Sequence, residues 1–284
     1  MAGSNNSTSE LPGVAMGRLP KTFVINLKRR GDKRDLAVQE CAQKKLCASP
    51  TIFQGVDGEA LSRKQGKSKL VGNNLELSWE APGNRGRRVR IVRNRVNKGT
   101  EWGTLGCAMS HEKLLKQVSD RDRTLILEDD IKLCDDAGQC LKFHLDYLDD
   151  VHPNWQLLML GGSLRDKWAK VTRNAKVSPR RVPQLRYCEC AYFSHGYVIR
   201  KAAIPTVLKF LAEGSPSDSA LMRLQTKSPK QCFIIAAPQL ATQDKKLQSD
   251  IRQASSQPVG GTEERLAPNG FQAIQLQTSW QQRP

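Results

Sequence analysis

The sequence predicts an α/β protein with a mostly parallel central sheet. Short apolar runs, each typical of a buried strand, alternate along the chain with segments of helical period. These apolar runs end in polar or glycine-rich residues, and open α/β sheets bind their ligands at such strand ends. The chain has 284 residues, which is enough for one large core.

The first half of the chain contains three of the expected strands. Apolar composition predicts strands at 22–27, 51–56 and 124–127. A helix is expected after the first strand, where Leu36, Cys41 and Ala42 begin an apolar face. A second helix is expected over about 103–118, because Leu105 and Leu115 fall within one apolar arc.

The second half repeats this pattern. Strands are expected at 156–160, 193–199 and 231–236, and a helix is expected over 201–212, which Gly214 ends. Residues 62–101 differ, because they are rich in Gly, Asn, Lys and Arg and lack a helical period. Their partial alternation at 88–93 predicts a basic hairpin or a mobile flap.

These elements define one expected domain over residues 20–252, with 62–101 as an insertion. The polar segments 1–19 and 253–284 are expected to be a disordered and a loose tail. No apolar run reaches the length of a membrane-spanning helix, and the first nineteen residues lack the apolar region of a secretory signal. As written, the chain is expected to be cytoplasmic; an incomplete N-terminus would allow a secretory lumen instead.

The composition favours anionic partners. Lys and Arg number 45 against 28 Asp and Glu, so the formal net charge is +17. Such a surplus attracts nucleic acid, anionic surfaces or phosphate-bearing ligands, and it is concentrated in two clusters, at 28–34 and at Arg85–Lys98. Eight cysteines are too few for a disulfide scaffold and include no CxxC pair, so we expect reduced and mostly buried thiols.

An acidic triplet follows the strand at 124–127. Three like charges in one short turn repel, and each raises the pKa of its neighbours, unless a cation neutralises them. Because residues i and i+2 of a strand point to the same side, Glu128 and Asp130 are expected to converge on one ion. Oxygen ligands suit Mg²⁺ or Mn²⁺, which can also bridge a diphosphate. The alternative is a solvated strand end whose acids cap the next element or pair with Lys132.

The order of motifs resembles that of glycosyltransferase family 25, which includes bacterial lipopolysaccharide sugar transferases and procollagen galactosyltransferases. The resemblance extends over most of residues 23–251. It rests on VINLKRR at 24–30, GVDG at 55–58, GTLGCAMSH at 103–111, LILEDDI at 125–131, SHGYVIRKA at 194–202, PSD at 216–218 and the Q…SDI segment that ends at 251. The serine–histidine and LEDD pieces at this spacing are the most specific.

This resemblance implies a GT-A-like, Rossmann-like nucleotide-sugar transferase domain. The expected donor is a UDP-sugar, with UDP-galactose as the first expectation, and the expected cofactor is Mn²⁺ or Mg²⁺. Transfer would be inverting, so a base must take the proton of the acceptor hydroxyl. Asp218 is that candidate, and its alternative role is to cap the following helix. Glu128, Asp130 and Asp250 are the expected metal ligands. The acceptor would be a glycan, a lipid-linked sugar or a hydroxylated protein.

The remaining candidates for the nucleotide-sugar site lie near the strand ends. Asn26, Arg29, Arg30 and Arg34 would contact nucleotide or phosphate, or else form a solvated basic helix face. Asp57 would bind uridine or its ribose, or else only form a turn, and Asp129 belongs to the donor site with its triplet neighbours. We interpret the two remaining candidates, His111 and His195, as packing residues.

Two other functions compete with a transferase. A basic module could bind nucleic acid or an anionic surface through Arg85–Lys98, but this segment has no aromatic residue for stacking on bases. A degenerate family member could bind a sugar nucleotide without turnover. In this chain Ser219 and Ala220 follow Asp218, where the family usually has an aromatic or acidic pair, so the acceptor pocket is expected to differ.

Overall fold

The computed structural model describes residues 19–63, 67–71, 74–81, 84–92, 100–164, 185–192, 194–236, 239–244 and 246–247. Both predicted tails, except Leu19, and the predicted metal ligand Asp250 lie outside them.

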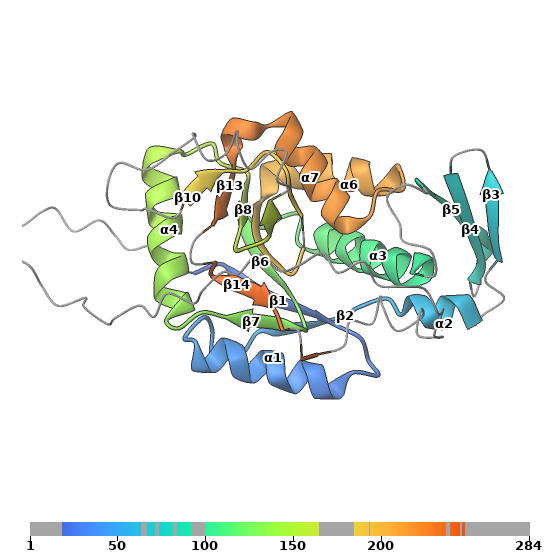
Figure 1. The fold of residues 1–284 in the computed structure, drawn as a ribbon, viewed down its shortest axis with the longest axis horizontal. Coiled ribbons are helices and arrows are strands. Elements are labelled where there is room, and N and C mark those ends of the chain that lie inside the picture. Colours follow the sequence, from blue (N-terminus) through green and yellow to red (C-terminus); the bar gives the residue numbers. More distant parts are fainter. Residues whose placement is uncertain are drawn as a thin grey trace, which may run out of the picture.

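A seven-stranded sheet forms the centre of the described structure (Figure 1). Its strand order is β2 (Thr51–Gln54), β1 (Lys21–Asn26), β6 (Arg123–Glu128), β12 (Gly196–Arg200), β8 (Leu157–Met159), β13 (Cys232–Ile235) and β10 (Leu185–Tyr187). β1 pairs in parallel with β2 and β6, and β8 pairs in parallel with β13. Only β12 and β10 run against their neighbours. The prediction of a mostly parallel α/β sheet is therefore confirmed.

Helices cover both faces of this sheet. They are α1 (Gly31–Gln43), α3 (Glu101–Gln117), α4 (Ala137–Val151), α6 (Ile204–Ala212) and α7 (Ser217–Lys227), and short 3₁₀ turns at Lys201–Ala203 and Pro229–Gln231 flank the last two. The helix α4 was not among the elements expected from the sequence. Its buried Leu141, Leu145 and Leu148 lie on one helical face, at the spacing that marks a packed helix.

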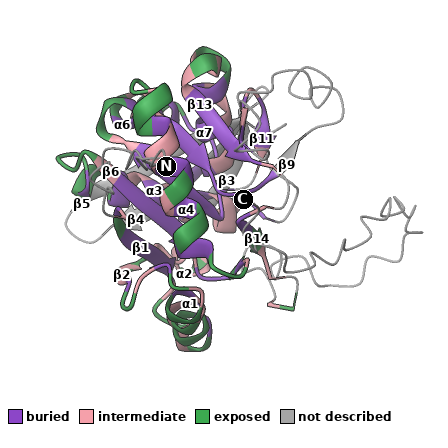
Figure 2. Cartoon of the chain, turned by 90° about the vertical axis from the view of Figure 1, so that its left-hand side faces the viewer, coloured by how far each residue is buried: buried purple, intermediate pink, exposed green. Residues whose placement is uncertain are grey.

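Successive strand residues point to opposite faces and so build two cores. Phe23 and Ile126 pack with α3, α6 and α7, whereas Val24, Leu125 and Leu127 pack with α1 and α4. Figure 2 shows the strands of the sheet buried between helices whose outer surfaces are exposed. The two apolar faces explain why the strands read as continuous apolar runs in the sequence.

The predicted basic insertion forms a separate antiparallel sheet of β3 (Lys67–Val71), β4 (Asn74–Ala81) and β5 (Asn84–Val92). It follows the short helix α2 (Gly58–Arg63) and lies at one end of the molecule (Figure 1). Leu77 of β4 is buried against Leu105 of α3, which anchors this sheet on the main domain. Residues 93–98 of the basic segment lie outside the described residues.

Two short ribbons complete the architecture: β9 (Ser163–Leu164) pairs with β11 (Ala191–Tyr192), and β7 (Ile131–Leu133) pairs with β14 (Ala241–Gln243). In the second ribbon Gln243 lies opposite Ile131, directly after the acidic triplet. A distant part of the chain thereby reaches the end of β6. No helix in the described part of the chain combines the length and the apolar character needed to cross a membrane.

The start of α2 is packed too closely against α3 to accept a side chain at Gly58. A Cβ atom there would lie 1.8 Å from the carbonyl oxygen of Trp102. We therefore expect Gly58→Ala to lower the free energy of unfolding by about 1–3 kcal/mol, because the backbones must separate. Urea denaturation measures this. Gly31→Ala is the control, because its added Cβ would meet no atom closer than 4.0 Å.

Candidate nucleotide-sugar and metal site

Three neighbouring parallel strands end at the same edge of the sheet. β1 ends at Asn26, β2 ends shortly before Asp57, and β6 ends at Glu128. An open pocket lies at this edge, where α/β sheets bind ligands. Its charged lining comprises two bases and five carboxylic acids: Arg29, Lys33, Asp57, Glu59, Glu128, Asp129 and Asp130. The acidic side chains outnumber the basic ones, so an anionic ligand needs a bound cation to offset their repulsion here.

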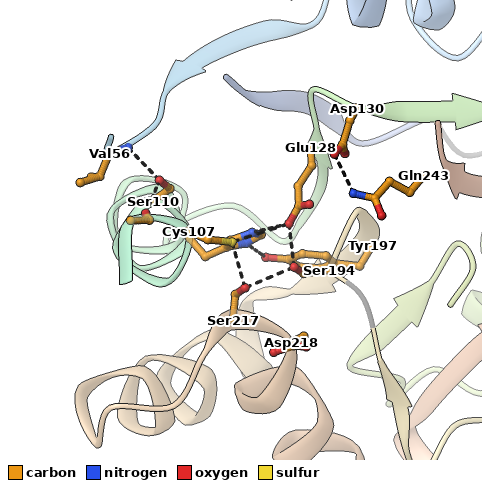
Figure 3. Close-up of polar contacts among 12 residues, drawn as sticks. Val56, Cys107, Ser110, Glu128, Asp130, Ser194, Tyr197, Ser217, Asp218 and Gln243 are labelled. Carbon is orange, nitrogen blue, oxygen red and sulfur yellow. Dashed lines mark hydrogen bonds and ion pairs between the residues drawn. The ribbon is translucent and has the colours of Figure 1, made fainter. Parts of the chain in front are cut away.

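Glu128 is held by a buried hydrogen-bond cluster (Figure 3). Its Oε1 lies 2.7 Å from the hydroxyl of Ser194, 3.3 Å from Nε2 of His111 and 3.8 Å from the thiol of Cys107. Tyr197 in turn lies 2.8 Å from Nδ1 of His111 and orients the imidazole. Burial raises the pKa of Glu128, but the hydrogen bond and charge of His111 and the Ser194 hydroxyl outweigh it and lower the pKa to about 2. Glu128 is thus ionised and well satisfied.

Asp129 is fixed from the side of α1. Its Oδ2 accepts a hydrogen bond of 2.7 Å from the amide of Asn26, and its Oδ1 lies 3.9 Å from the ammonium group of Lys33. The Lys33 side chain is only 1% exposed. A lysine buried this deeply needs a carboxylate partner, so the two residues fix the first turn of α1 against the triplet.

Asp130 has a different environment. Its Oδ2 accepts a hydrogen bond of 2.8 Å from Gln243 on β14. Its Oδ1 is buried and has no hydrogen-bond partner among the residues that the structure describes. Burial and the neighbouring charge of Glu128 raise the pKa of Asp130 above its usual value. A buried carboxylate with an unsatisfied oxygen is costly by itself, and a bound cation would relieve that cost.

Two donor sets near the triplet could hold a metal. The oxygen of Asp130 is a hard donor of the kind that Mn²⁺ or Mg²⁺ prefers, and it is unsatisfied. A second set combines Cys107, His111 and Glu128, whose donor atoms lie within 4.8 Å of one another. That set is softer and suits zinc better. Its atoms already bond one another, and burial raises the pKa of the Cys107 thiol well above its usual value, so the first set fits a hard cation better.

The predicted basic residues separate into two groups. Arg29 lines the pocket, and its Nε donates a hydrogen bond of 2.9 Å to Asp57. Arg30 instead pairs with Asp32, and Arg34 pairs with Asp35 on the exposed face of α1. Neither of these two arginines is among the residues that line the pocket.

Asp57 forms the predicted turn and also lines the pocket. Its Oδ1 accepts hydrogen bonds from the amides of Glu59 and Ala60, which is the capping contact at the start of α2. Its Oδ2 binds Arg29. Because the side chain also lines the pocket, turn chemistry does not exclude contact with a ligand.

Asp218 lies in the first turn of α7, below the Glu128 cluster (Figure 3). It is not the N-cap of the helix, which is Pro216, but its Oδ1 accepts a hydrogen bond of 2.6 Å from the Ser219 amide. Burial raises the pKa of Asp218 above its usual value. The preceding Ser217 lies 3.2 Å from both Ser194 and Cys107, so α7 contacts the triplet through this cluster.

Several residues of the site were not among the predicted ligands: Lys33, Cys107, Ser194, Tyr197, Ser217 and Gln243. His111 is buried as predicted, but it also bonds the triplet. The spacing of Cys107 and His111, four residues apart on one helix, was the available signal. His195 is a buried packing residue whose Nε2 lies 3.3 Å from the carbonyl of Ala241.

Comparison with known proteins supports a transferase. The model of glycosyltransferase family 25, described as an LPS biosynthesis protein family, matches residues 19–221. Human procollagen galactosyltransferase 2 is 31% identical over 62% of this chain and 25% of its own length. Zebrafish procollagen galactosyltransferase 1 is 24% identical over 87% of this chain and 38% of its own length. The chain thus spans a quarter to two fifths of these relatives.

A mimivirus procollagen lysyl hydroxylase and glycosyltransferase is 30% identical over 61% of this chain and 18% of its own length. Among solved structures, mouse xyloside xylosyltransferase 1 in its apo form is similar, with a TM-score of 0.31 and 9% identity over 74% of this chain and 69% of that one.

Proposed function

Because the chain belongs to glycosyltransferase family 25, we propose that it transfers a hexose, with galactose as the expected sugar, from a UDP-sugar to a hydroxyl acceptor. We further propose that the domain is of the GT-A type, that transfer is assisted by Mn²⁺ or Mg²⁺, and that it inverts the anomeric centre. Family membership supports glycosyl transfer itself. The donor, the metal and the stereochemistry are the proposed parts.

The observation that carries this proposal is the state of Asp130. Its carboxylate is buried, ionised only at a cost, and has one oxygen without a partner, and it lines the pocket at the sheet edge. A hard cation on this oxygen would neutralise the acidic pocket and supply a binding point for a diphosphate. We assign Asp130 as the main metal ligand, with Glu128 and Asp250 as further candidates.

The residues around the pocket support a nucleotide donor. Arg29 offers a guanidinium group for a phosphate, and Asp57 offers a carboxylate for a ribose hydroxyl. Trp102 and Val56 form an apolar wall on which a base can pack. Asn26 and Lys33 hold Asp129 in place rather than facing outward, so we propose that they position the triplet.

The acceptor hydroxyl needs a base, and Asp218 is the proposed one. Asp218→Asn keeps the oxygen that accepts from the Ser219 amide but removes the base. We expect acceptor-dependent UDP release to fall by about 10²–10⁴-fold, while metal-dependent binding of UDP stays unchanged. In the wild type the rate should rise with pH through the raised pKa of Asp218, because only the carboxylate can take the proton.

A hydroxylated collagen-like peptide is the first acceptor to test for this prediction, since the relatives are procollagen galactosyltransferases. Asp146→Asn is the matched control, because Asp146 lies on α4 and pairs only with Lys142 among the described residues. Equal activity of Asp218→Asn and the wild type would remove Asp218 from the mechanism.

The proposed function is tested by measuring UDP released from a panel of UDP-sugars, with Mn²⁺, with Mg²⁺ and with a chelator. Many transferases slowly pass the sugar to water, so no acceptor is needed. Metal-dependent release that favours one sugar would support the proposal and identify the donor. Metal-dependent UDP binding without release on any acceptor would indicate a degenerate member. If UDP-sugars do not bind at all and nucleic acid binds with strong salt dependence, the basic-module hypothesis replaces this one.

A further inference from the structure

Two pairs of cysteines lie away from the proposed site, where α1 ends and α4 begins. Cys41 is in the last turn of α1 and Cys47 follows the helix, whereas Cys134 follows β7 and Cys140 is in the first turn of α4. All four are free thiols in the structure. Within each pair the two thiols lie close enough for each to be the largest influence on the pKa of the other. The two cysteines of each pair are six residues apart in the sequence, so a disulfide between them would close a short loop.

The backbone holds the first pair together. Lys45 has a left-handed φ of 55°, and the carbonyl of Cys41 accepts from the amides of Leu46 at 2.9 Å and Cys47 at 3.4 Å. With the bond from the Lys45 amide to the carbonyl of Ala42, this is a Schellman motif, which turns the chain back over the end of the helix. The reversal brings Cys47 to Cys41 without any help from a covalent bond.

The second pair flanks the start of α4. Asp136, at a left-handed φ of 53°, leads into α4, and its carbonyl accepts from the Cys140 amide at 3.0 Å. The two loops also bind each other. Lys45 pairs with Asp136 at 3.2 Å, and the Gly138 amide donates to the carbonyl of Lys44 at 3.1 Å. Contacts that do not involve sulfur therefore hold the loop that carries Cys47 against the loop that leads to Cys140.

One thiol of each pair is accessible and reactive. Cys140 is exposed and Cys47 is half-buried, whereas Cys41 is fully buried. The neighbouring partner thiol lowers the pKa of Cys47 and of Cys140 to about 7, despite partial burial. A thiolate is the nucleophile in disulfide exchange, so Cys47 and Cys140 can begin the reaction and their partners can complete it.

We propose that Cys41 with Cys47, and Cys134 with Cys140, form two disulfides by exchange with a small-molecule disulfide such as oxidised glutathione. The thiolate of Cys47 attacks one sulfur of glutathione disulfide, forms a mixed disulfide and releases one reduced glutathione. Cys41 then loses its proton and attacks the protein sulfur of this mixed disulfide, releasing a second glutathione. Two protein thiols are oxidised and one small disulfide is reduced to two thiols. Cys140 and Cys134 react in the same way.

The two disulfides would be closed in an oxidising compartment and open in a reducing one. The test is mass spectrometry of the folded protein after equilibration with defined ratios of reduced and oxidised glutathione, followed by alkylation of the remaining thiols. We expect a loss of two hydrogen atoms for each of the pairs Cys41–Cys47 and Cys134–Cys140. Cys188 and Cys232 should remain alkylatable after denaturation, because burial raises the pKa of both thiols. Each disulfide should raise the melting temperature by roughly 5 °C.

Cys47→Ser and Cys140→Ser are the test variants, because both positions tolerate a polar group at the partly exposed surface. Each should abolish its own disulfide and its own share of the shift in melting temperature, and leave the other disulfide intact. Cys190→Ser is the control and should change neither. Three outcomes would overturn the proposal: all thiols stay reduced, glutathione stays bound to Cys47 or Cys140, or the cysteines pair in another order.

Discussion

Asp130→Asn is expected to reduce metal-dependent release of UDP by about 10²–10³-fold or more, while the protein keeps or gains thermal stability. The loss of activity follows from the loss of Oδ1, which is the only carboxylate oxygen of the triplet that is buried without a hydrogen-bond partner among the described residues. The gain in stability follows from the raised pKa of Asp130, which shows that folding disfavours its charge. An amide carries no charge, and its oxygen still accepts from Gln243. The two effects have opposite signs, which separates a lost site from a misfolded protein.

Two measurements test this prediction: UDP release at saturating Mn²⁺, and the melting temperature with and without metal. In the wild type, saturating metal should raise the melting temperature, because a ligand that binds only the folded state stabilises it. In Asp130→Asn this rise should vanish. Asp120→Asn, at an exposed turn, is the matched control and should change neither quantity. Full activity in Asp130→Asn would refute Asp130 as a metal ligand.

The second large effect is expected from His111→Leu, which should lower the free energy of unfolding by about 3 kcal/mol. This substitution removes the partner that holds Glu128 ionised and leaves the carboxylate, whose side chain is only 23% exposed, with fewer donors. It also leaves the hydroxyl of Tyr197 without its ring-nitrogen partner. Urea denaturation measures the loss. His152→Leu is the matched control, because its Nε2 is buried without a hydrogen-bond partner among the described residues and its ring packs against Tyr147, Tyr187 and Phe233.

A double-mutant cycle with Glu128→Gln isolates the pair itself. We expect a coupling energy of about 1–3 kcal/mol at neutral pH. The folded pKa of Glu128 is about 2, below its ordinary value of 4.5, so the pair contributes fully above pH 4.5 and its contribution falls as the pH approaches 2. Additive effects of the two substitutions at neutral pH would mean that His111 and Glu128 act independently.

The sequence alone determined six of the seven strands of the central sheet and their approximate positions. Runs of three or four adjacent apolar residues bounded by polar ones are typical of strands in a sheet with two covered faces, so the elements at 22–27, 124–127 and 156–160 were predictable. The position of the acidic triplet at a strand end was predictable for the same reason. The direction of each strand was not predictable, because a strand that runs antiparallel to its neighbours, such as β12, has the same kind of composition as a parallel strand.

Burial along α1 shows what composition cannot tell. The sequence predicted an apolar face that includes Leu36 and Ala42, but both are exposed, and the buried residues are Lys33, Ala37 and Cys41. Lys33 is buried because Asp129, almost a hundred residues further along the chain, lies beside it. An apolar side chain at the surface costs little, whereas a buried lysine is stable only with such a partner.

The roles within the triplet were likewise decided by tertiary structure. The sequence determined that three carboxylates follow β6 and that the chain has the motifs of a sugar transferase. Only the fold surrounds Glu128 with donors from α3 and from Ser194, assigns Asp129 to Asn26 and Lys33, and leaves one oxygen of Asp130 unsatisfied. The physical reason is that the ability of a carboxylate to bind a cation depends on which donors already satisfy it, and those donors come from distant parts of the chain.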